Sequence, residues 1–187
     1  MIIVLVGSLF GHELPLTVTQ MLWVNLIMDT FAAAALASLP PNKNVMKDKP
    51  RKNDAFIITP SMRRNIFFMG FSFVALLFFL LYQFRDNHGD ISSYNLSVFF
   101  TIFVMLQFWN MFNVKAFASG KSAFYNLKNS IGFLFILLAI IVGQILIVQF
   151  GGDVFRTVPI SIEHWLLIIG STSLILIIGE LKRIFQG

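Results

Sequence analysis

Residues 131–150 read IGFLFILLAIIVGQILIVQF, a stretch without a single charged side chain. A helix of about 20 apolar residues is long enough to cross the hydrocarbon core of a bilayer. Further apolar runs of this kind lie at about residues 16–39, 66–84, 96–114 and 165–181. A shorter run at residues 1–10 predicts the end of a truncated membrane helix. The sequence therefore predicts an all-α fold, a polytopic transmembrane helix bundle with five full spans and a truncated N-terminal one.

The composition of the 187-residue chain excludes several classes of protein. Hydrophobic side chains make up 57% of the residues, only 12% are charged, and the mean hydropathy is +0.78. Soluble domains are about a quarter charged, so neither a soluble enzyme nor a disordered tail fits. The chain has no cysteine, which excludes disulfides and thiolate metal sites. The net charge of +5 does not indicate nucleic-acid binding, because the basic residues are confined to the segments between spans.

The basic residues are distributed unequally between the two faces that alternating spans define. All of the 14 lysines and arginines except Arg85 and Arg156 fall on one face. These residues are Lys43, Lys47, Lys49, Arg51, Lys52, Arg63, Arg64, Lys115, Lys121, Lys128, Lys182 and Arg183. Cytoplasmic loops are enriched in Lys and Arg. We therefore expect this face and the C-terminus in the cytoplasm, and an integral multi-pass protein of a plasma or inner membrane.

One carboxylate lies deep within a predicted span. Asp29 is near the middle of the first full span, and Asn25 precedes it by four residues, which would place both side chains on one face of an α-helix. A carboxylate in the bilayer centre costs about 2.5–3.5 kcal/mol, so such residues usually have a function. Amide and carboxylate oxygens together are ligands that Ca²⁺ prefers. The alternative is a protonated Asp29 that joins helices through a hydrogen bond.

The third full span carries the polar residues Gln107, Asn110 and Asn113, spaced by three. Such a stripe must face protein or water. Gln107 is the deepest and could offer one neutral oxygen to an ion, whereas we assign Asn110 and Asn113 to bonds with neighbouring helices. With Asn25 and Asp29, the chain then supplies about four side-chain oxygens of the six to eight that Ca²⁺ takes. The remaining ligands must come from backbone, water or other helices.

Other polar and small residues receive structural assignments. We expect Glu180 to form an interfacial ion pair with Lys182 or Arg183, and Thr59 to cap a helix whose first turn contains Pro60. The residues assigned to helix packing or close helix contact are Gln144, Gln149, Gly132, Gly143 and Gly170.

Several stretches carry a family resemblance. Residues 15–41, with QMLWVNLIMDT at positions 20–30, resemble the sixth membrane helix of calcium-transporting P-type ATPases. FVMLQFWNMFN at 103–113 is similar to that family's eighth helix, and IVQFGG at 147–152 and Gly179-Glu180 are similar to its ninth and tenth. The resemblance implies that residues 1–13 are the end of a membrane helix and an external loop, and that residues 14–187 form the C-terminal membrane domain of a cation ATPase.

Two residues indicate which variant of the family the chain resembles. Pumps of the sarcoplasmic-reticulum type, with two calcium sites, have Thr where this chain has Met28 and Glu where it has Gln107. The resemblance is thus to the plasma-membrane type with one calcium site, and it implies Asn25 and Asp29 as ligands of the transported Ca²⁺. Gln107 occupies the position of the vacated second site, so it is the weaker candidate ligand.

The resemblance also implies partners for this chain. The family's phosphorylated Asp-Lys-Thr-Gly-Thr motif is not found, since Asp48-Lys49 is followed by Pro50. We therefore expect the chain alone to be inactive, with ATP and Mg²⁺ used only by the parent protein. Its partners would be the lipid bilayer, upstream membrane helices and the cytoplasmic phosphorylation domain of the same pump.

Two alternatives stay open from the sequence. The first is an autonomous membrane channel or scaffold without ATPase activity, which the reading frame upstream of Met1 would distinguish. The second keeps the pump but changes the ion, because Mn²⁺ also accepts oxygen ligands.

Overall fold

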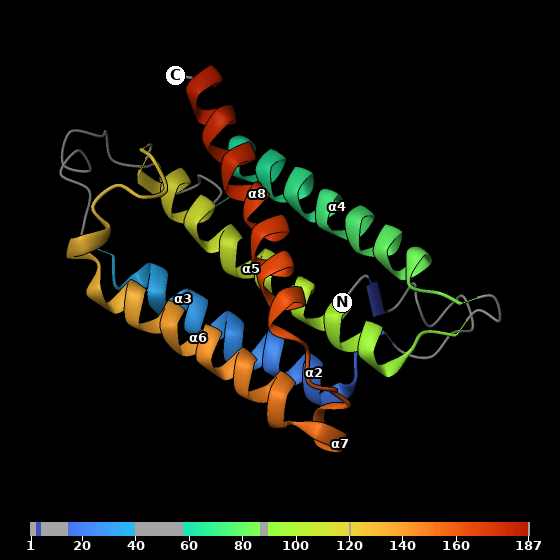
Figure 1. Cartoon of the computed structure of the whole chain (residues 1–187). Coiled ribbons are helices and arrows are strands. Elements are labelled where there is room, and N and C mark those ends of the chain that lie inside the picture. The colour runs from blue at the N-terminus through green and yellow to red at the C-terminus, as the bar shows by residue number, and fades with distance from the viewer. Residues whose placement is uncertain (1–2, 5–14, 40–57, 87–89, 120, 187) are drawn as a thin grey trace, which may run out of the picture.

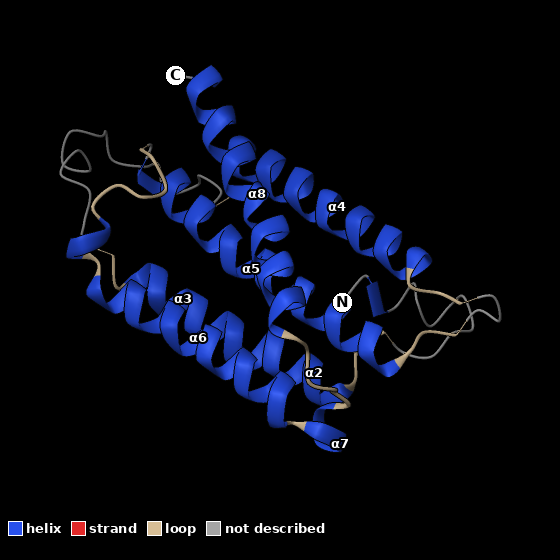
Figure 2. Ribbon diagram, viewed as in Figure 1, coloured by secondary structure: helices blue, strands red, loops and turns tan. Residues whose placement is uncertain are grey.

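The computed structural model describes residues 3–4, 15–39, 58–86, 90–119 and 121–186, which are largely helical (Figures 1 and 2). The elements are α2 (Val18–Leu22), the π-helix η1 (Trp23–Met28), α3 (Asp29–Ala37), α4 (Pro60–Gln83), α5 (Ser93–Ser119), the 3₁₀-helix η3 (Leu127–Asn129), α6 (Ile131–Phe150), α7 (Gly152–Phe155) and α8 (Ile162–Gln186). Because α2, η1 and α3 form one segment, five helical segments are long and apolar enough to cross a membrane. The predicted all-α bundle with five spans is confirmed.

Some sequence assignments lie outside this description. Of the predicted truncated N-terminal helix only Ile3 and Val4 are described, and both are helical. The basic residues from Lys43 to Lys52 lie outside the described residues.

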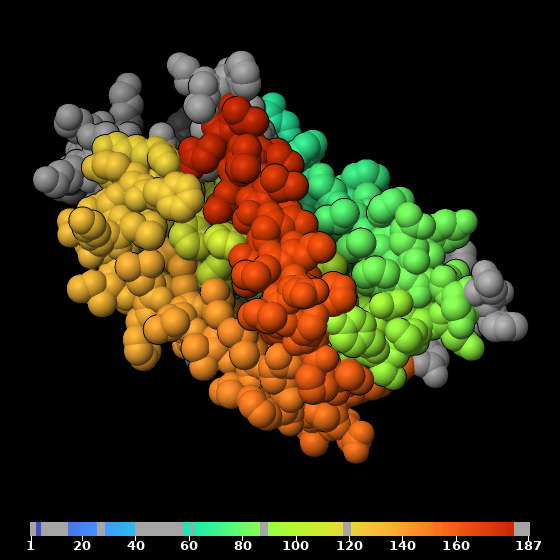
Figure 3. Space-filling view, in the orientation of Figure 1, coloured from blue at the N-terminus to red at the C-terminus, as the bar shows by residue number. Residues whose placement is uncertain are grey.

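Helix α5 lies at the centre of the bundle, and α8 crosses it on one face (Figures 1 and 3). Phe99, Phe100 and Val104 of α5 are fully buried. In addition, the Trp109 indole nitrogen donates a hydrogen bond to Thr172 Oγ1 of α8 at 3.1 Å. The indole N–H of Trp109 therefore meets protein rather than lipid, as the cost of unpaired polar groups in hydrocarbon requires.

Asn113 shows how closely α5 and α8 approach. Its Nδ2 donates to the carbonyl oxygen of Ile175 at 3.1 Å, so the predicted bond to a neighbouring helix is confirmed. A Cβ at Gly179 of α8 would overlap the Asn113 side chain, and glycine is needed there for the contact. The predicted close contact at Gly132 is also confirmed, with Ser38 Oγ 3.0 Å from the position of a Cβ. The close contact predicted at Gly170 is not found, because no atom of the described residues lies within 4 Å of a Cβ there.

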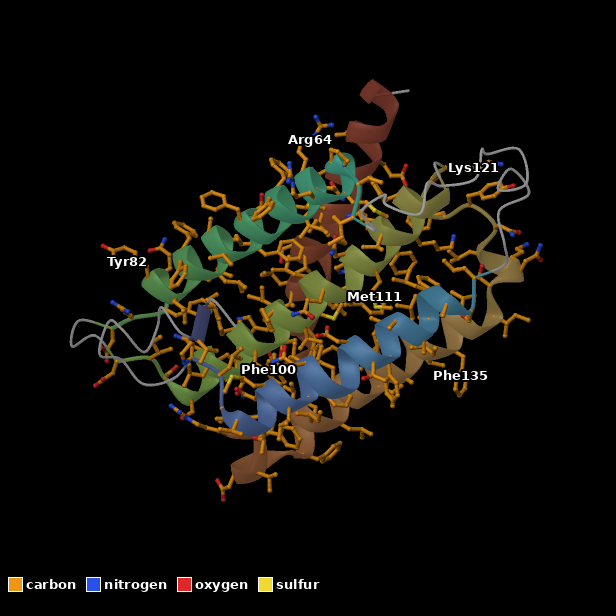
Figure 4. The ribbon with its side chains drawn as sticks, turned by 180° about the vertical axis from the view of Figure 1, so that it is seen from behind. Arg64, Tyr82, Phe100, Met111, Lys121 and Phe135 are labelled. Atoms are coloured by element: carbon orange, nitrogen blue, oxygen red, sulfur yellow. The ribbon has the colours of Figure 1, made fainter. Side chains whose placement is uncertain are left out.

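Large apolar side chains cover the outer faces of α4 and α6. Phe67 and Phe71 of α4 are 71% and 76% exposed, and Phe135 and Phe150 of α6 are 71% and 80% exposed. Phe135 points away from the bundle in Figure 4. Water would not tolerate so many exposed rings on a bundle of this size, whereas lipid chains solvate them.

Helix α4 begins at the cap that the sequence predicts. Thr59 is the N-cap and its Oγ1 accepts from the backbone nitrogen of Met62 at 3.2 Å, while Pro60 occupies the first turn. Both predictions are confirmed. The helix therefore starts six residues before the predicted apolar span, since the cap and not hydropathy sets its first residue.

Side chains of α2 and α6 hold the connection between α6 and α8. Thr19 Oγ1 and Gln20 Nε2 of α2 donate to the carbonyl oxygens of Val154 and Phe155 at 2.7 and 2.8 Å. Gln149 of α6 bonds both the backbone nitrogen and the backbone oxygen of Ile160, each at 3.0 Å. This end of α2 is thereby tied to the end of α6, and Gln149 has the packing role that the sequence predicted.

The connection between α5 and α6 is held by two opposite charges. Lys115 of α5 is only 4% exposed, and its ammonium donates to the carbonyl oxygens of Ala123 and Tyr125 at 3.3 and 2.5 Å. Glu180 of α8 accepts from the backbone nitrogen of Ala123 at 2.6 Å and from Ser122 Oγ at 3.1 Å. We call this arrangement the loop clamp.

The loop clamp gives Glu180 a role that the sequence did not predict. We expected an ion pair with Lys182 or Arg183, whose side chains lie outside the described residues. That prediction therefore stays a prediction, and in addition Glu180 accepts hydrogen bonds from a backbone N–H and a hydroxyl of the loop. Arg64 and Lys121, from segments predicted to share the basic face, lie at one end of the bundle and Tyr82 lies at the other (Figure 4).

Candidate functional site

The segment that carries Asp29 starts as an ordinary capped helix. Thr17 and Gln20 form a capping box, in which Gln20 N donates to Thr17 Oγ1 at 3.3 Å and Thr17 N donates to Gln20 Oε1 at 2.9 Å. After α2 the backbone changes to the π-helix η1, and Asp29 N bonds the carbonyl oxygen of Val24, five residues back. Such π segments inside helices are rare and frequently lie at functional sites.

Asp29 lines a cavity of about 400 Å³. The polar side chains of its lining are Asp29 of α3 and Gln107 and Asn110 of α5. Its other walls are apolar and come from α3, α4 and α5: Ala32, Leu36, Ile66, Met69, Gly70, Phe73, Met111 and Val114. Met111 marks α5 in Figure 4. The structure therefore brings together Asp29 and Gln107, two of the three predicted site residues, and adds Asn110.

Asn25 does not share this lining. It lies in η1 with an exposed side chain, although the sequence placed it on the same face as Asp29. That prediction assumed α-helical spacing, in which residues four apart are neighbours. In η1 the backbone hydrogen bonds join residues five apart instead of four. The face that carries Asn25 is therefore shifted by the time the chain reaches Asp29.

Asn110 is the site residue that sequence reasoning missed. We assigned it to an interhelical bond together with Asn113, but it lines the cavity. The signal was present in the sequence: Gln107 and Asn110 are three apart on an α-helix and therefore neighbours on one face. Asn113, three residues further, donates to α8 instead.

The chemistry of the cavity favours a hard cation. One carboxylate and two amides can present about four oxygens, and the other residues of the lining are apolar. Within the described residues no three His, Cys, Asp or Glu side chains gather, so a soft or strongly anionic metal site is not formed there. Oxygen ligands of mixed charge suit Ca²⁺ or Mn²⁺ better than softer metals.

Comparison with known proteins gives the family. Residues 13–185 match the family model described as "Cation transporting ATPase, C-terminus". The chain is 34% identical to plasma membrane calcium-transporting ATPase 1 of Homo sapiens and 35% identical to plasma membrane calcium-transporting ATPase 3 of Homo sapiens, in each case over 176 residues. It is 35% identical to plasma membrane calcium-transporting ATPase 1 of Gallus gallus.

These alignments cover 88% of this chain and 14% of each relative. The chain thus spans about one seventh of the length of the curated relatives it matches. The resemblance found in the sequence of residues 15–41 and 103–113 is confirmed, and with it the multi-pass membrane character that the five apolar helices indicate. The chain belongs to the cation-transporting ATPase family, of which it carries the C-terminal membrane region.

Proposed function

We propose that this chain is the C-terminal transmembrane part of an ATP-driven Ca²⁺ export pump and supplies part of a single intramembrane Ca²⁺ site. The observation that carries the proposal is the cavity whose polar lining consists of Asp29, Gln107 and Asn110. We propose Ca²⁺ as the ion because the relatives are named as calcium-transporting ATPases.

The energetics of the cavity support an ion site. An ionised carboxylate within a membrane span is costly and needs a cation or a polar partner. A divalent ion at Asp29 would offset this cost directly, and the amide oxygens of Gln107 and Asn110 would replace part of its water shell. About four side-chain oxygens leave two to four ligands to backbone, water and helices from the rest of the pump. Asn25 stays a proposed ligand, reached through backbone rearrangement at η1.

In the proposed pump the chain contributes no catalytic group. ATP and Mg²⁺ act in the cytoplasmic domains, and phosphorylation there changes the affinity and exposure of the ion site by shifting the population of two conformations. We place the basic face, including Arg64 and Lys121, and the C-terminus in the cytoplasm, because Lys and Arg are enriched there.

The proposal is tested by transport. Inside-out vesicles that contain the full-length protein should accumulate ⁴⁵Ca²⁺ when ATP is added, and micromolar Ca²⁺ should stimulate formation of the phosphorylated protein. Stimulation by Mn²⁺ but not by Ca²⁺ would show that the transported ion is Mn²⁺. Ion flux without ATP and without a phosphorylated intermediate would favour the channel and overturn the pump.

The amides of α5 provide a second prediction. We expect Gln107→Leu to raise the Ca²⁺ concentration for half-maximal phosphorylation roughly 3- to 10-fold, because one neutral oxygen is removed from the cavity. Asn113→Leu also replaces an amide by an apolar side chain, six residues along α5 from Gln107, and it breaks the bond to Ile175 instead. It should lower the apparent unfolding temperature and leave the Ca²⁺ response within about two-fold. Equal Ca²⁺ responses of both variants would contradict the assignment of Gln107.

A further inference from the structure

The first residue of η1 is anchored in α6. The Trp23 indole nitrogen donates to Gln144 Oε1 at 3.0 Å, in a buried hydrogen bond between residues far apart in the sequence. Trp23 is 9% exposed and Gln144 is 1% exposed. Helix α6 runs without interruption from Ile131 to Phe150, so it gives the anchor a regular support.

Gly143 makes room for the indole ring. A Cβ at this position would lie 2.5 Å from Trp23 Cη2 and 3.0 Å from Trp23 Cζ2. A methyl group cannot approach an aromatic carbon that closely, and the rigid ring has no flexible end that could move aside. The ring edge therefore sits in a notch of α6, while Gln144 binds the indole nitrogen. These two contacts together oppose both rotation and sliding of η1.

The anchor and the cavity lie on different faces of the same segment. Trp23 and Val24 are buried, whereas Asp29 lines the cavity between α3, α4 and α5. Val24 is also the residue whose carbonyl oxygen accepts from Asp29 N. A hydrogen-bonded ladder thus connects the anchored residues to Asp29, and a rotation of η1 at Trp23 would move the carboxylate within the cavity.

The contact between Trp23 and Gln144 leaves one buried polar group of Gln144 without a described partner. Gln144 Nε2 is buried and no described residue accepts a hydrogen bond from it. A buried donor without a partner costs free energy that an apolar side chain of the same size would avoid. Gln144 is therefore a poor choice for stability but a good one for fixing the orientation of an indole.

We propose that Trp23, Gln144 and Gly143 form a pin that sets the rotation of η1 and so positions Asp29 in the cavity. This inference rests on the function proposed above. The three are positioning residues: they touch no ion and act through the backbone between Trp23 and Asp29.

The test measures phosphorylation of the full-length pump in two ways. Phosphorylation by ATP as a function of Ca²⁺ reports on the ion site, and phosphorylation by inorganic phosphate without Ca²⁺ reports on the fold and the catalytic domains. Trp23→Phe keeps an aromatic ring but removes the donor, and Gln144→Leu removes the acceptor. Each should raise the half-maximal Ca²⁺ concentration roughly 3- to 10-fold and leave phosphorylation by inorganic phosphate unchanged.

Two further variants sharpen the result. The double variant Trp23→Phe/Gln144→Leu should lie within about two-fold of the larger single effect, because both substitutions remove one shared bond. Gly143→Ala should also weaken the Ca²⁺ response, since it displaces the ring without touching the bond. Trp109→Phe is the matched control: it removes an indole donor that bonds Thr172 at 3.1 Å between α5 and α8, and it should shift the half-maximal Ca²⁺ concentration less than two-fold.

The outcomes separate the pin from the pump. A Ca²⁺ response that Trp23→Phe and Gln144→Leu leave unchanged, or change no more than Trp109→Phe does, overturns the pin. If Trp23→Phe alone abolishes phosphorylation by inorganic phosphate, this variant is not folded. The Ca²⁺ responses of Gln144→Leu and Gly143→Ala are then compared with that of Trp109→Phe, and equal responses overturn the pin. If Asp29→Asn leaves the Ca²⁺ response intact, the proposed ion site itself fails, whatever the pin variants show.

Discussion

Replacing Asp29 by Asn should abolish Ca²⁺-stimulated phosphorylation of the full-length pump, or raise the half-maximal Ca²⁺ concentration at least 100-fold. Asn keeps the size of the side chain but removes the only carboxylate of the cavity lining. A carboxylate attracts a divalent ion through its full negative charge, whereas an amide offers a neutral oxygen, so the loss of the carboxylate outweighs that of any single amide. The measurement is the phosphorylated protein formed from labelled ATP across a range of Ca²⁺ concentrations.

Asp153→Asn provides the matched control for Asp29→Asn. Asp153 lies in α7, is exposed and is not part of the cavity lining. The Ca²⁺ response of this variant should match that of the unchanged protein. Asp29→Asn should still accept phosphate from inorganic phosphate without Ca²⁺, which shows that the protein is folded. Phosphorylation of Asp29→Asn by ATP at the original Ca²⁺ affinity would show that Asp29 is not a ligand of the ion.

Lys115→Met should cause the largest loss of stability among single substitutions in the loop clamp. Methionine fills the space of the lysine stem but removes the ammonium that donates to the carbonyl oxygens of Ala123 and Tyr125. Hydrogen bonds to charged groups contribute about 1.5–3 kcal/mol each, so we expect the free energy of unfolding to fall by about 3 kcal/mol. The apparent unfolding temperature in detergent, followed by tryptophan fluorescence, measures the change.

Lys128→Met makes the same substitution at an exposed position in η3, within the connection between α5 and α6. It should change the free energy of unfolding by less than about 0.5 kcal/mol, as exposed substitutions usually do. Equal unfolding temperatures of the two variants would mean that the clamp does not stabilise the loop.

The sequence predicts the bundle well because the membrane imposes a length and a composition on each span. The uncharged run at residues 131–150 coincides with α6, which begins at Ile131 and ends at Phe150 in the structure. Local caps are also readable, as Thr59 and Pro60 show, since a cap depends on adjacent residues only. Both kinds of signal are local in the chain.

Parts of the candidate site depend on geometry that the sequence does not display. Nothing in the residue types of 23–28 marks a π-helix, so Asn25 and Asp29 were assigned to one face by α-helical spacing. The clamp role of Glu180 was missed for a different reason. Its described partners belong to a loop that is distant in the sequence, whereas Lys182 and Arg183 are adjacent to it. Likewise Gly170 looks like Gly143 in the sequence, but only Gly143 faces an indole ring.

The helices around the cavity differ in how firmly they are bonded to the rest of the bundle. The segment with α3 is bonded to α6 through Trp23, and α5 is bonded to α8 through Trp109 and Asn113. Helix α4 packs mainly on α5 and presents much of its surface to lipid. Among the described residues α4 therefore forms the most weakly packed wall of the cavity, and a change in the volume available to the ion should require less work there than at α3 or α5.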